Sequence, residues 1–288
     1  MKARTAAFAL LVALVFAACG GVGDDEGPGS GGDGIEHPSG ADELVLRVHT
    51  GGGFVPVEFT LREIPGFSLY GDGRLIVTGP VIEIYPGPAL PNLQVTRLTE
   101  EGVQAILEEA RRVGLLDDDA SYDYPCVTDV PTTTFTVSAE GRTHTVSAYA
   151  LGFEDQMTAD CPDVDVEARA ALSAFWTKLG DLESWLPEGS LGESEPFVPE
   201  EMRVYVMPYQ GDPELEQEPI EWPLEGSPAE FGEPDRNLPD YRCGVVSGDD
   251  LDLLLPLAER ANQLTPWVAD GDEVGLVFRP LLPDEDGC

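Results

Sequence analysis

The side chain whose position indicates chemistry most clearly is the thiol of Cys19. It follows an apolar run from Ala6 to Ala18, and that run begins just after the basic residues Lys2 and Arg4. A charged start, an apolar stretch of this length and small residues at its end are typical of a secretory signal peptide, and the run is too short to cross a bilayer. The sequence therefore predicts export, with residues 1–18 as the signal peptide.

The residues Phe16, Ala17, Ala18 and Cys19 resemble the lipobox of bacterial lipoproteins, with phenylalanine where most lipoboxes carry leucine. The resemblance implies that the Cys19 thiol receives diacylglycerol and that the chain is cut before this residue. Several acyl chains on one residue give a lasting anchor in the cell membrane, facing the extracytoplasmic side. The alternative is an ordinary secretory signal followed by a chance cysteine.

Four further cysteines, an even number in an exported chain, indicate two disulfide bonds. Three pairings are open, and the local pairs Cys126–Cys161 and Cys243–Cys288 are favoured because each lies within one expected domain. Each pair closes a loop of several tens of residues, which stabilises the fold by about 4 kcal/mol on the chain-entropy view. No CxxC is present and no histidine stands at zinc-ligand spacing, so neither a zinc site nor a redox role is expected.

Motifs for covalent or metal-assisted catalysis are missing from the sequence, which has no GxSxG, SxxK or HExxH. Asp129 precedes a run of threonines, where an aspartate more often accepts backbone N–H groups than acts as a base. His49 and His144 lie on separate expected strands, where histidines are usually solvated, and a shared metal site is not expected. The sequence thus predicts no catalytic residue, no metal and no cofactor.

Three clusters of acidic residues keep weak calcium binding open as an alternative. They are Asp117–Asp119 with Asp123, then Asp160 with Asp163 and Asp165, and Asp270 with Asp272 and Glu273. The first departs from an EF-hand because Tyr122 occupies the sixth position, where that loop needs glycine.

The charge of the chain is strongly negative: 54 acidic residues against 16 basic ones give a formal net charge of −38. Such a field repels nucleic acid and anionic lipid headgroups, so phosphate-backbone binding is excluded. Because the acids are spread along the whole chain, we interpret them as an adaptation to a saline medium rather than as a specific site.

The order of strand and helix signals predicts an α+β fold. We expect a flexible acidic tether over 19–43, an α+β domain over 44–186, a linker over 187–199 and a smaller strand–helix–strand domain over 200–288. The first domain is expected to combine antiparallel hairpins with two packed helices. Alternating apolar residues predict its strands: 44–49, 55–62, 67–70, 74–77, 81–85, 132–138 and 142–148.

Two helices are predicted in the first domain. The stretch 99–114 has Thr99 as a cap and one apolar stripe. The stretch 165–179 is expected to turn four residues inward: Val166, Ala170, Phe175 and Leu179.

In the second domain, strands are expected at 203–207, 242–247 and 273–279. Ser247 and Asp250 resemble a capping box for a helix that reaches about residue 264 and bends at Pro256. The loop 209–240 and its flanks carry scattered aromatic residues, which either contact a protein or glycan partner or pin the loop to its own domain: Tyr205, Tyr209, Trp222, Phe231 and Tyr241.

A second resemblance rests on Tyr70-x-Asp72-Gly73, the helix start at Leu98–Glu101 and the run Thr128–Thr133. These motifs resemble an uncharacterised domain family of bacterial secreted proteins and lipoproteins, and the resemblance implies no activity. The sequence as a whole favours a non-enzymatic, lipid-anchored binding or scaffolding protein outside the cytoplasmic membrane. The rival is a hydrolase at the cell envelope that uses a pair of carboxylates hidden among the many acidic residues.

Overall fold

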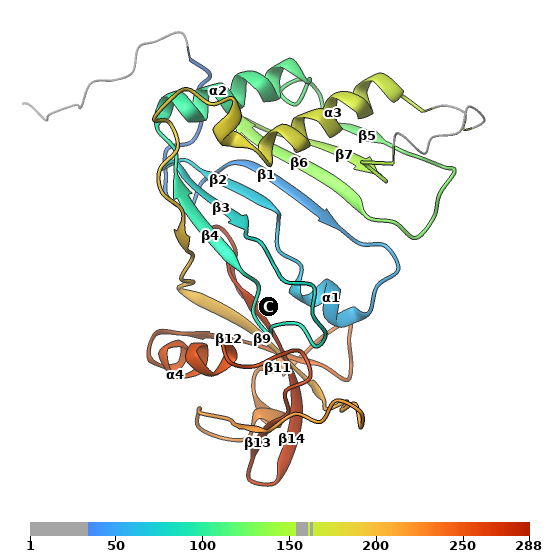
Figure 1. Cartoon of the computed structure of the whole chain (residues 1–288), viewed down its shortest axis with the longest axis vertical. Coiled ribbons are helices and arrows are strands. Elements are labelled where there is room, and N and C mark those ends of the chain that lie inside the picture. The colour runs from blue at the N-terminus through green and yellow to red at the C-terminus, as the bar shows by residue number, and fades with distance from the viewer. Residues whose placement is uncertain (1–33, 154–160, 162–163) are drawn as a thin grey trace, which may run out of the picture. The chain divides into compact units, whose positions relative to one another are not determined.

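Two β-sheets with helices packed against them make up the residues that the computed structural model describes, 34–153, 161 and 164–288 (Figure 1). Strands predominate and the class is α+β, as the sequence predicted. Gly34–Cys288 form one compact unit, and the division of this unit into two domains stays a prediction.

The first sheet has eight strands, β1 Leu44–Gly51, β2 Phe67–Tyr70, β3 Arg74–Thr78, β4 Leu93–Arg97, β5 Ala120–Tyr122, β6 Thr132–Ala139, β7 Arg142–Tyr149 and β8 Glu195–Pro196. Their order is β5-β7-β6-β1-β2-β3-β4-β8. The two predicted hairpins, β2–β3 and β6–β7, are confirmed. Gly73 and Gly141 have φ of 81° and 73° at their turns, a region that favours glycine.

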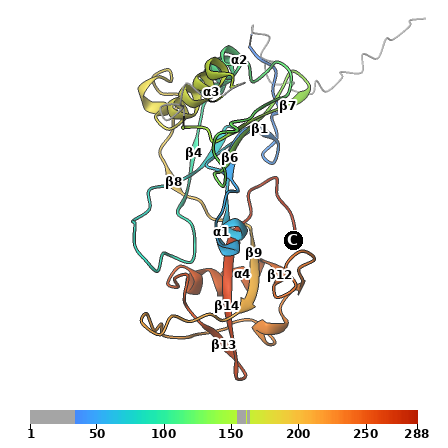
Figure 2. The ribbon, with the colours of Figure 1, turned by 90° about the vertical axis from the view of Figure 1, so that its right-hand side faces the viewer.

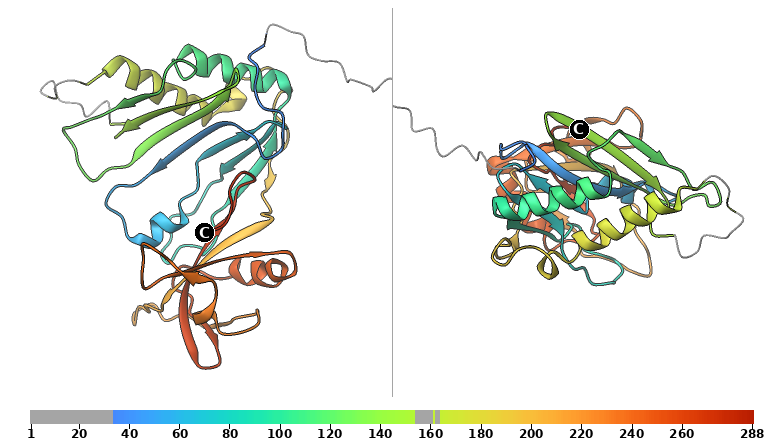
Figure 3. Two further views of the ribbon diagram at one scale, coloured as in Figure 1. Left: turned by 180° about the vertical axis from the view of Figure 1, so that it is seen from behind. Right: turned by 90° about the horizontal axis from the view of Figure 1, so that it is seen from above.

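Two helices, α2 Glu100–Arg112 and α3 Val166–Leu179, lie side by side on one face of this sheet (Figure 3). The hydroxyl of Thr99 accepts a hydrogen bond from the N–H of Gly102 (3.4 Å), which confirms the predicted cap. The apolar stripe of α2 is buried, including Ile106 and Leu107. Each such side chain stabilises the fold by about 1.5–3 kcal/mol.

The buried face of α3 differs from the prediction. Val166 is 54% exposed and Ala170 is also exposed, whereas Arg169 is fully buried. The Arg169 guanidinium donates to the carbonyls of Tyr122 (3.1 Å) and Ala150 (2.8 Å). These hydrogen bonds offset the cost of burying the charged side chain. The buried face of α3 therefore includes Arg169, whereas the sequence predicted Ala170 there.

The second sheet consists of β9 Glu201–Pro208, β10 Ile220–Glu221, β11 Glu233–Pro234, β12 Arg242–Ser247, β13 Trp267–Ala269 and β14 Asp272–Pro280. Their order is β10-β13-β14-β9-β12-β11. Three aromatic rings form the centre of its core, with Trp267 in edge-on contact with Trp222 (6.4 Å) and Phe278 (5.4 Å). The predicted strands at 203–207, 242–247 and 273–279 are confirmed.

The helix of the second half, α4 Gly248–Ala258, is shorter than predicted. Ser247 stands at its N-cap position without a side-chain hydrogen bond, so the predicted capping box is not formed. Pro256 lies inside the helix, and the helix ends two residues later, because proline removes a backbone donor and clashes with the preceding turn.

The predicted strand at 55–62 is wrong: this stretch contains the helix α1 Val57–Arg62. Pro56, with φ −55°, precedes the helix and cannot donate to a neighbouring strand. Glu58 in the first turn and Arg62 in the last turn have the charges that the helix dipole favours.

The predicted strand at 81–85 is also wrong, because these residues belong to the loop between β3 and β4. Their alternating pattern has no buried face, since all five side chains are exposed. Pro80 and Pro86 bracket the segment and cannot donate to a ladder of hydrogen bonds.

The predicted tether joins the folded unit earlier than expected. Ile35 is buried in the core of the first sheet. The side-chain amide of Gln104 on α2 bonds both backbone groups of Ile35, accepting from its N–H (2.7 Å) and donating to its carbonyl (2.9 Å). In addition, the N–H of Glu140 donates to the carbonyl of Glu36 (2.8 Å).

The segment that follows β14 is held by ion pairs to both sheets. Arg47 on β1 donates to Asp284 (2.7 Å), and Arg279 on β14 donates two bonds of 2.7 Å to Glu285. The Arg279 Nε also donates to the Glu63 carbonyl (2.9 Å).

Both disulfides expected from the sequence, Cys126–Cys161 and Cys243–Cys288, are present. The second fixes the far end of the segment after β14 to β12.

Candidate binding surface

Large apolar side chains gather around α1 and on the loop between β3 and β4, which is teal in Figure 2. These two segments supply seven of the ten large apolar side chains that are exposed in the described part of the chain: Phe54, Val55, Phe59, Val81, Ile82, Ile84 and Tyr85. We call these seven residues the apolar loop surface. Phe54 is 90% exposed and Ile82 73% exposed. Five of the seven, all but Phe54 and Val55, line two cavities that share Arg62. Apolar side chains that gather in one exposed patch are typical of interaction sites.

The loop between β3 and β4 is held at both ends. At its neck, the N–H of Gly79 donates to the carbonyl of Asn92 (2.7 Å). At its far end, the N–H of Ala89 donates to the carbonyl of Ala261 (3.1 Å), and the N–H of Gln263 donates back to the loop (2.9 Å). These bonds restrain both ends of the segment that carries the exposed side chains, which lowers the entropic cost of fixing that segment on binding.

Two cavities open at the apolar loop surface. One, of about 490 Å³, is lined by Val81, Ile82 and Ile84 among other residues. The other, of about 290 Å³, is lined by Phe59 and Tyr85 together with residues of the second sheet. Volumes of this order are within or close to the range of ligand sites. Both cavities are lined by Arg62 and Gln263.

Arg62 is a half-buried cation between these cavities. It stands four residues after Glu58, a spacing at which opposite charges on a helix usually pair. The Glu58 carboxylate instead accepts a hydrogen bond from the Tyr241 hydroxyl (2.7 Å), and Arg62 Nη2 donates to the Ala89 carbonyl (3.2 Å). Among the described residues no carboxylate lies within 4.0 Å of its guanidinium, and burial lowers the pKa of Arg62 below its ordinary value.

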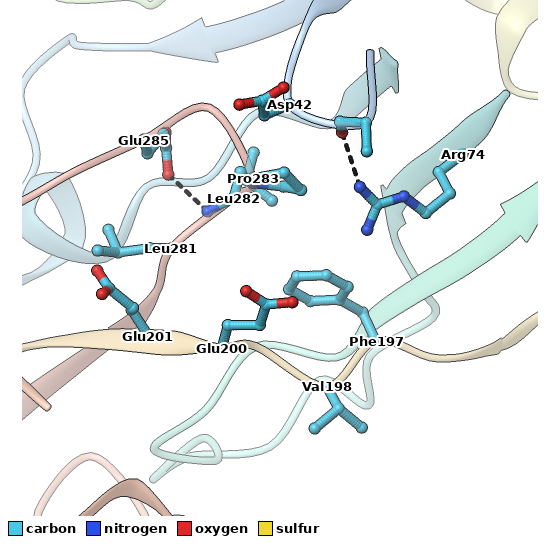
Figure 4. A pocket seen from close by; sticks show the side chains of 11 residues that line it. Asp42, Arg74, Phe197, Val198, Glu200, Glu201, Leu281, Leu282, Pro283 and Glu285 are labelled. Carbon is cyan, nitrogen blue, oxygen red and sulfur yellow. Dashed lines mark hydrogen bonds between the residues drawn. The ribbon is translucent and has the colours of Figure 1, made fainter. Parts of the chain in front are cut away.

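A third hollow, of about 350 Å³, is acidic and bears on the alternative of a carboxylate-dependent hydrolase (Figure 4). It is lined by Asp42, Glu200, Glu201 and Glu285, with Arg74 at one side. Figure 4 shows Glu285 bonded to the N–H of Leu282. Burial acts to raise the pKa of Glu285, but hydrogen bonds from Arg279 and from this N–H lower it below its ordinary value. A carboxyl group that acts as a general acid needs the opposite shift.

Asp129 and His144, two residues singled out in the sequence, both take part in local backbone contacts. Cys19 lies outside the described residues. Asp129 is exposed, has a φ of 63°, and its carbonyl accepts the N–H of Phe54 (3.2 Å), which makes it a turn residue. His144 is not solvated as expected, because it is 4% exposed and its Nδ1 lies 2.6 Å from the Asp117 carbonyl.

The acidic clusters also serve local structure. Within residues 34–153, 161 and 164–288, no group of three His, Cys, Asp or Glu side chains is arranged to hold a metal ion. Asp119 accepts the N–H of Thr145 (2.8 Å), and Asp165 caps α3 by accepting the N–H of Ala168 (3.0 Å). Asp160 and Asp163 lie outside the described residues.

The aromatic residues of the second half mostly fix its loop. Trp222 and Phe231 are in edge-on contact (5.3 Å), and Trp222 is buried. This arrangement agrees with the interpretation that they pin the loop to its own core.

The apolar loop surface was missed from the sequence because both of its segments were interpreted as strands. The prolines beside 81–85 were the available signal. Arg62 is the only lysine or arginine between Arg47 and Arg74, so the sequence shows it as an isolated cation but not as a cavity residue.

Comparison with protein-family models, curated protein sequences and solved structures finds no match to this chain. The lipobox at Cys19 and the resemblance to an uncharacterised domain family therefore stay predictions. No helix among the described residues combines the length and apolarity needed to span a membrane.

Proposed function

We propose that this protein is a lipid-anchored, extracytoplasmic and non-enzymatic binding protein whose partner contacts the apolar loop surface. The observation that carries the proposal is the display of seven exposed apolar side chains on two segments, one of which is hydrogen-bonded at both ends. Ordered apolar side chains that face water cost solubility unless something covers them.

The charge of the chain narrows the class of partner. A net charge of −38 repels nucleic acid and anionic lipid headgroups. A protein partner can contact the apolar loop surface through uncharged side chains, because the centres of protein interfaces are depleted of charged residues. The partner that fits is therefore a protein rather than a phosphate-bearing polymer.

The hydrolase alternative has less support. The acidic hollow contains carboxylates, but Glu285 is held ionised by Arg279 and the adjacent Arg74 is engaged by Asp72 (2.8 Å). These contacts are those of an ion-pair network that stabilises the fold.

The anchor is tested by Cys19→Ala in the native host. We expect the variant to be released into the medium or to remain uncleaved, because the thiol that accepts the lipid is gone. Fractionation and intact-mass analysis give the result. A variant that stayed on the membrane at the mature mass of the wild type would refute the lipid anchor.

The binding surface is tested by a photoactivatable amino acid placed at Ile82 in cells. Leu253 on α4 is the matched control, because it is also a large apolar residue and is 54% exposed. We expect a discrete crosslinked protein from position 82 and none of the same mass from position 253. The same products from both positions, or none from position 82, would contradict the proposed surface.

A further inference from the structure

Arg62 makes one hydrogen bond, fewer than the other half-buried arginines of the described chain that have no carboxylate partner. Six arginines of the described chain are paired with carboxylates: Arg47, Arg74, Arg97, Arg111, Arg112 and Arg279. Arg203 and Arg242 are half-buried and donate two and three hydrogen bonds to backbone carbonyls. Arg62 has no carboxylate partner among the described residues, although 54 acidic residues are present in the sequence. An incompletely paired cation in apolar surroundings is costly, so its environment calls for a physical explanation.

The two acids nearest to Arg62 in sequence are both engaged elsewhere. Glu58 accepts the Tyr241 hydroxyl at 2.7 Å. The Glu63 carboxylate lies 3.8 Å from His49. The guanidinium carries five N–H donors in a planar fork, and one hydrogen bond to a protein acceptor, the Ala89 carbonyl, is formed. The remaining donors are available to a ligand.

The position of Arg62 defines the chemistry of that ligand. Arg62 lines both cavities of the apolar loop surface. A carboxylate bound to it would form charge-assisted, bidentate hydrogen bonds, the strongest that arginine makes. Apolar groups on either side of that carboxylate would enter the cavity of Val81 and Ile84 and the cavity of Phe59 and Tyr85.

We propose that Arg62 binds an acidic side chain of an extended segment of the partner protein, with large apolar side chains two positions before and two positions after the acid. In an extended chain these three side chains point to one face. The inference rests on the proposed function, because it names the partner's contact segment for the same surface.

A peptide display selection tests the inference without knowledge of the partner. The bait is the full mature chain, and the library consists of random peptides of about twelve residues. We expect enriched peptides to carry Asp or Glu between two large apolar residues, and to lose binding when the bait carries Ile82→Ser. With Arg62→Gln as bait, we expect the apolar preference to persist and the acidic preference to disappear.

One selected peptide is then measured against matched variants. We expect Arg62→Gln to weaken binding by about 10- to 100-fold, from the loss of charge-assisted hydrogen bonds. Arg62→Lys should retain part of the affinity, because it keeps the charge but not the fork. Arg142→Gln, an exposed arginine on β7, should change nothing. Replacing the acidic residue of the peptide by its amide should weaken binding as much as Arg62→Gln does. The two changes together should weaken binding no more than either change alone.

The outcomes separate the inference from the proposed function. Peptides that need Ile82 but show no acidic preference would overturn the inference and leave the proposed function standing. A selection without any peptide that depends on Ile82 would overturn both. Binding to phosphatidylcholine vesicles that survives Arg62→Gln would show that the surface takes a bilayer, and would also overturn the inference. Thermal unfolding of each variant confirms that it is folded.

Discussion

Glu285→Gln should destabilise the protein, and by an amount that depends on pH. Glu285 accepts two hydrogen bonds of 2.7 Å from Arg279, and their side chains are 17% and 10% exposed. Glutamine keeps the shape and one acceptor, but it removes the charge opposite a mostly buried guanidinium. This pair connects β14 with the segment that carries Asp284, the partner of Arg47.

The expected cost is about 2 kcal/mol at pH 7. Hydrogen bonds to charged groups contribute about 1.5–3 kcal/mol each, and one partner of a buried pair costs about 3–5 kcal/mol when removed outright. Glutamine keeps one acceptor and the pair is partly exposed, so the loss of stability should lie in the lower of these two ranges. In urea, with a slope of about 2–3 kcal/mol/M, the midpoint should fall by about 0.7–1 M. Tryptophan fluorescence follows the transition.

The pH dependence gives a sharper test of the same reasoning. The folded-state pKa of Glu285 lies below its ordinary value. Its contribution to stability is therefore complete above the unfolded pKa, and it is lost as the pH falls through the lower folded pKa. The difference between wild type and Glu285→Gln should be largest at pH 7 and shrink toward zero in acid. Asp286→Asn, on an exposed neighbour, is the control and should shift the midpoint little. An equal difference at pH 7 and pH 3 would refute the ion-pair argument.

Three other perturbations have clear expected outcomes. Phe175→Ala should lower the free energy of unfolding by about 3–5 kcal/mol, because Phe175 is fully buried beside Phe135. Val166→Ala on the same helix should change it by less than about 0.5 kcal/mol; equal costs in urea titrations would contradict the observed helix face. Ile82→Ser should leave Tm unchanged because the side chain is 73% exposed, while abolishing binding of the selected peptides; a fall of several degrees in Tm would show that the side chain packs against the fold. Sodium chloride should raise Tm through general screening of the net charge of −38, with little preference for calcium at matched ionic strength; a calcium-specific rise of many degrees would contradict this expectation.

Local signals in the sequence predicted the elements that local interactions determine. The hairpin turns at Gly73 and Gly141 and the cap of α2 at Thr99 depend on residues only a few positions apart. The face of α3 depends instead on carbonyls of Tyr122 and Ala150, which lie 47 and 19 residues from Arg169. No periodicity within the helix reports such partners, so alanine was predicted at a buried position and the arginine was overlooked.

The candidate site is even less local. The Tyr241 hydroxyl that diverts Glu58 from Arg62 lies 183 residues further along the chain, and Ala89 lies 27 residues beyond Arg62. Residues 81–85 have the composition of a strand, but prolines stand on both sides of them and no strand of the described chain pairs with them, so their side chains stay exposed. The sequence therefore supported the prediction of a binding protein in general, while the position of the surface required the fold.

The contact between Ile35 and Gln104 determines where the described unit first resists a pull on its N-terminal end. A pull applied at Gly34 meets Ile35 before it reaches β1, which is bonded to β2 on one side and to β6 on the other. The two bonds from the Gln104 amide and the buried Ile35 side chain must break first. Because this contact lies outside the sheet, a pull that breaks it would free a few residues next to Gly34 before any strand of the first sheet is loaded.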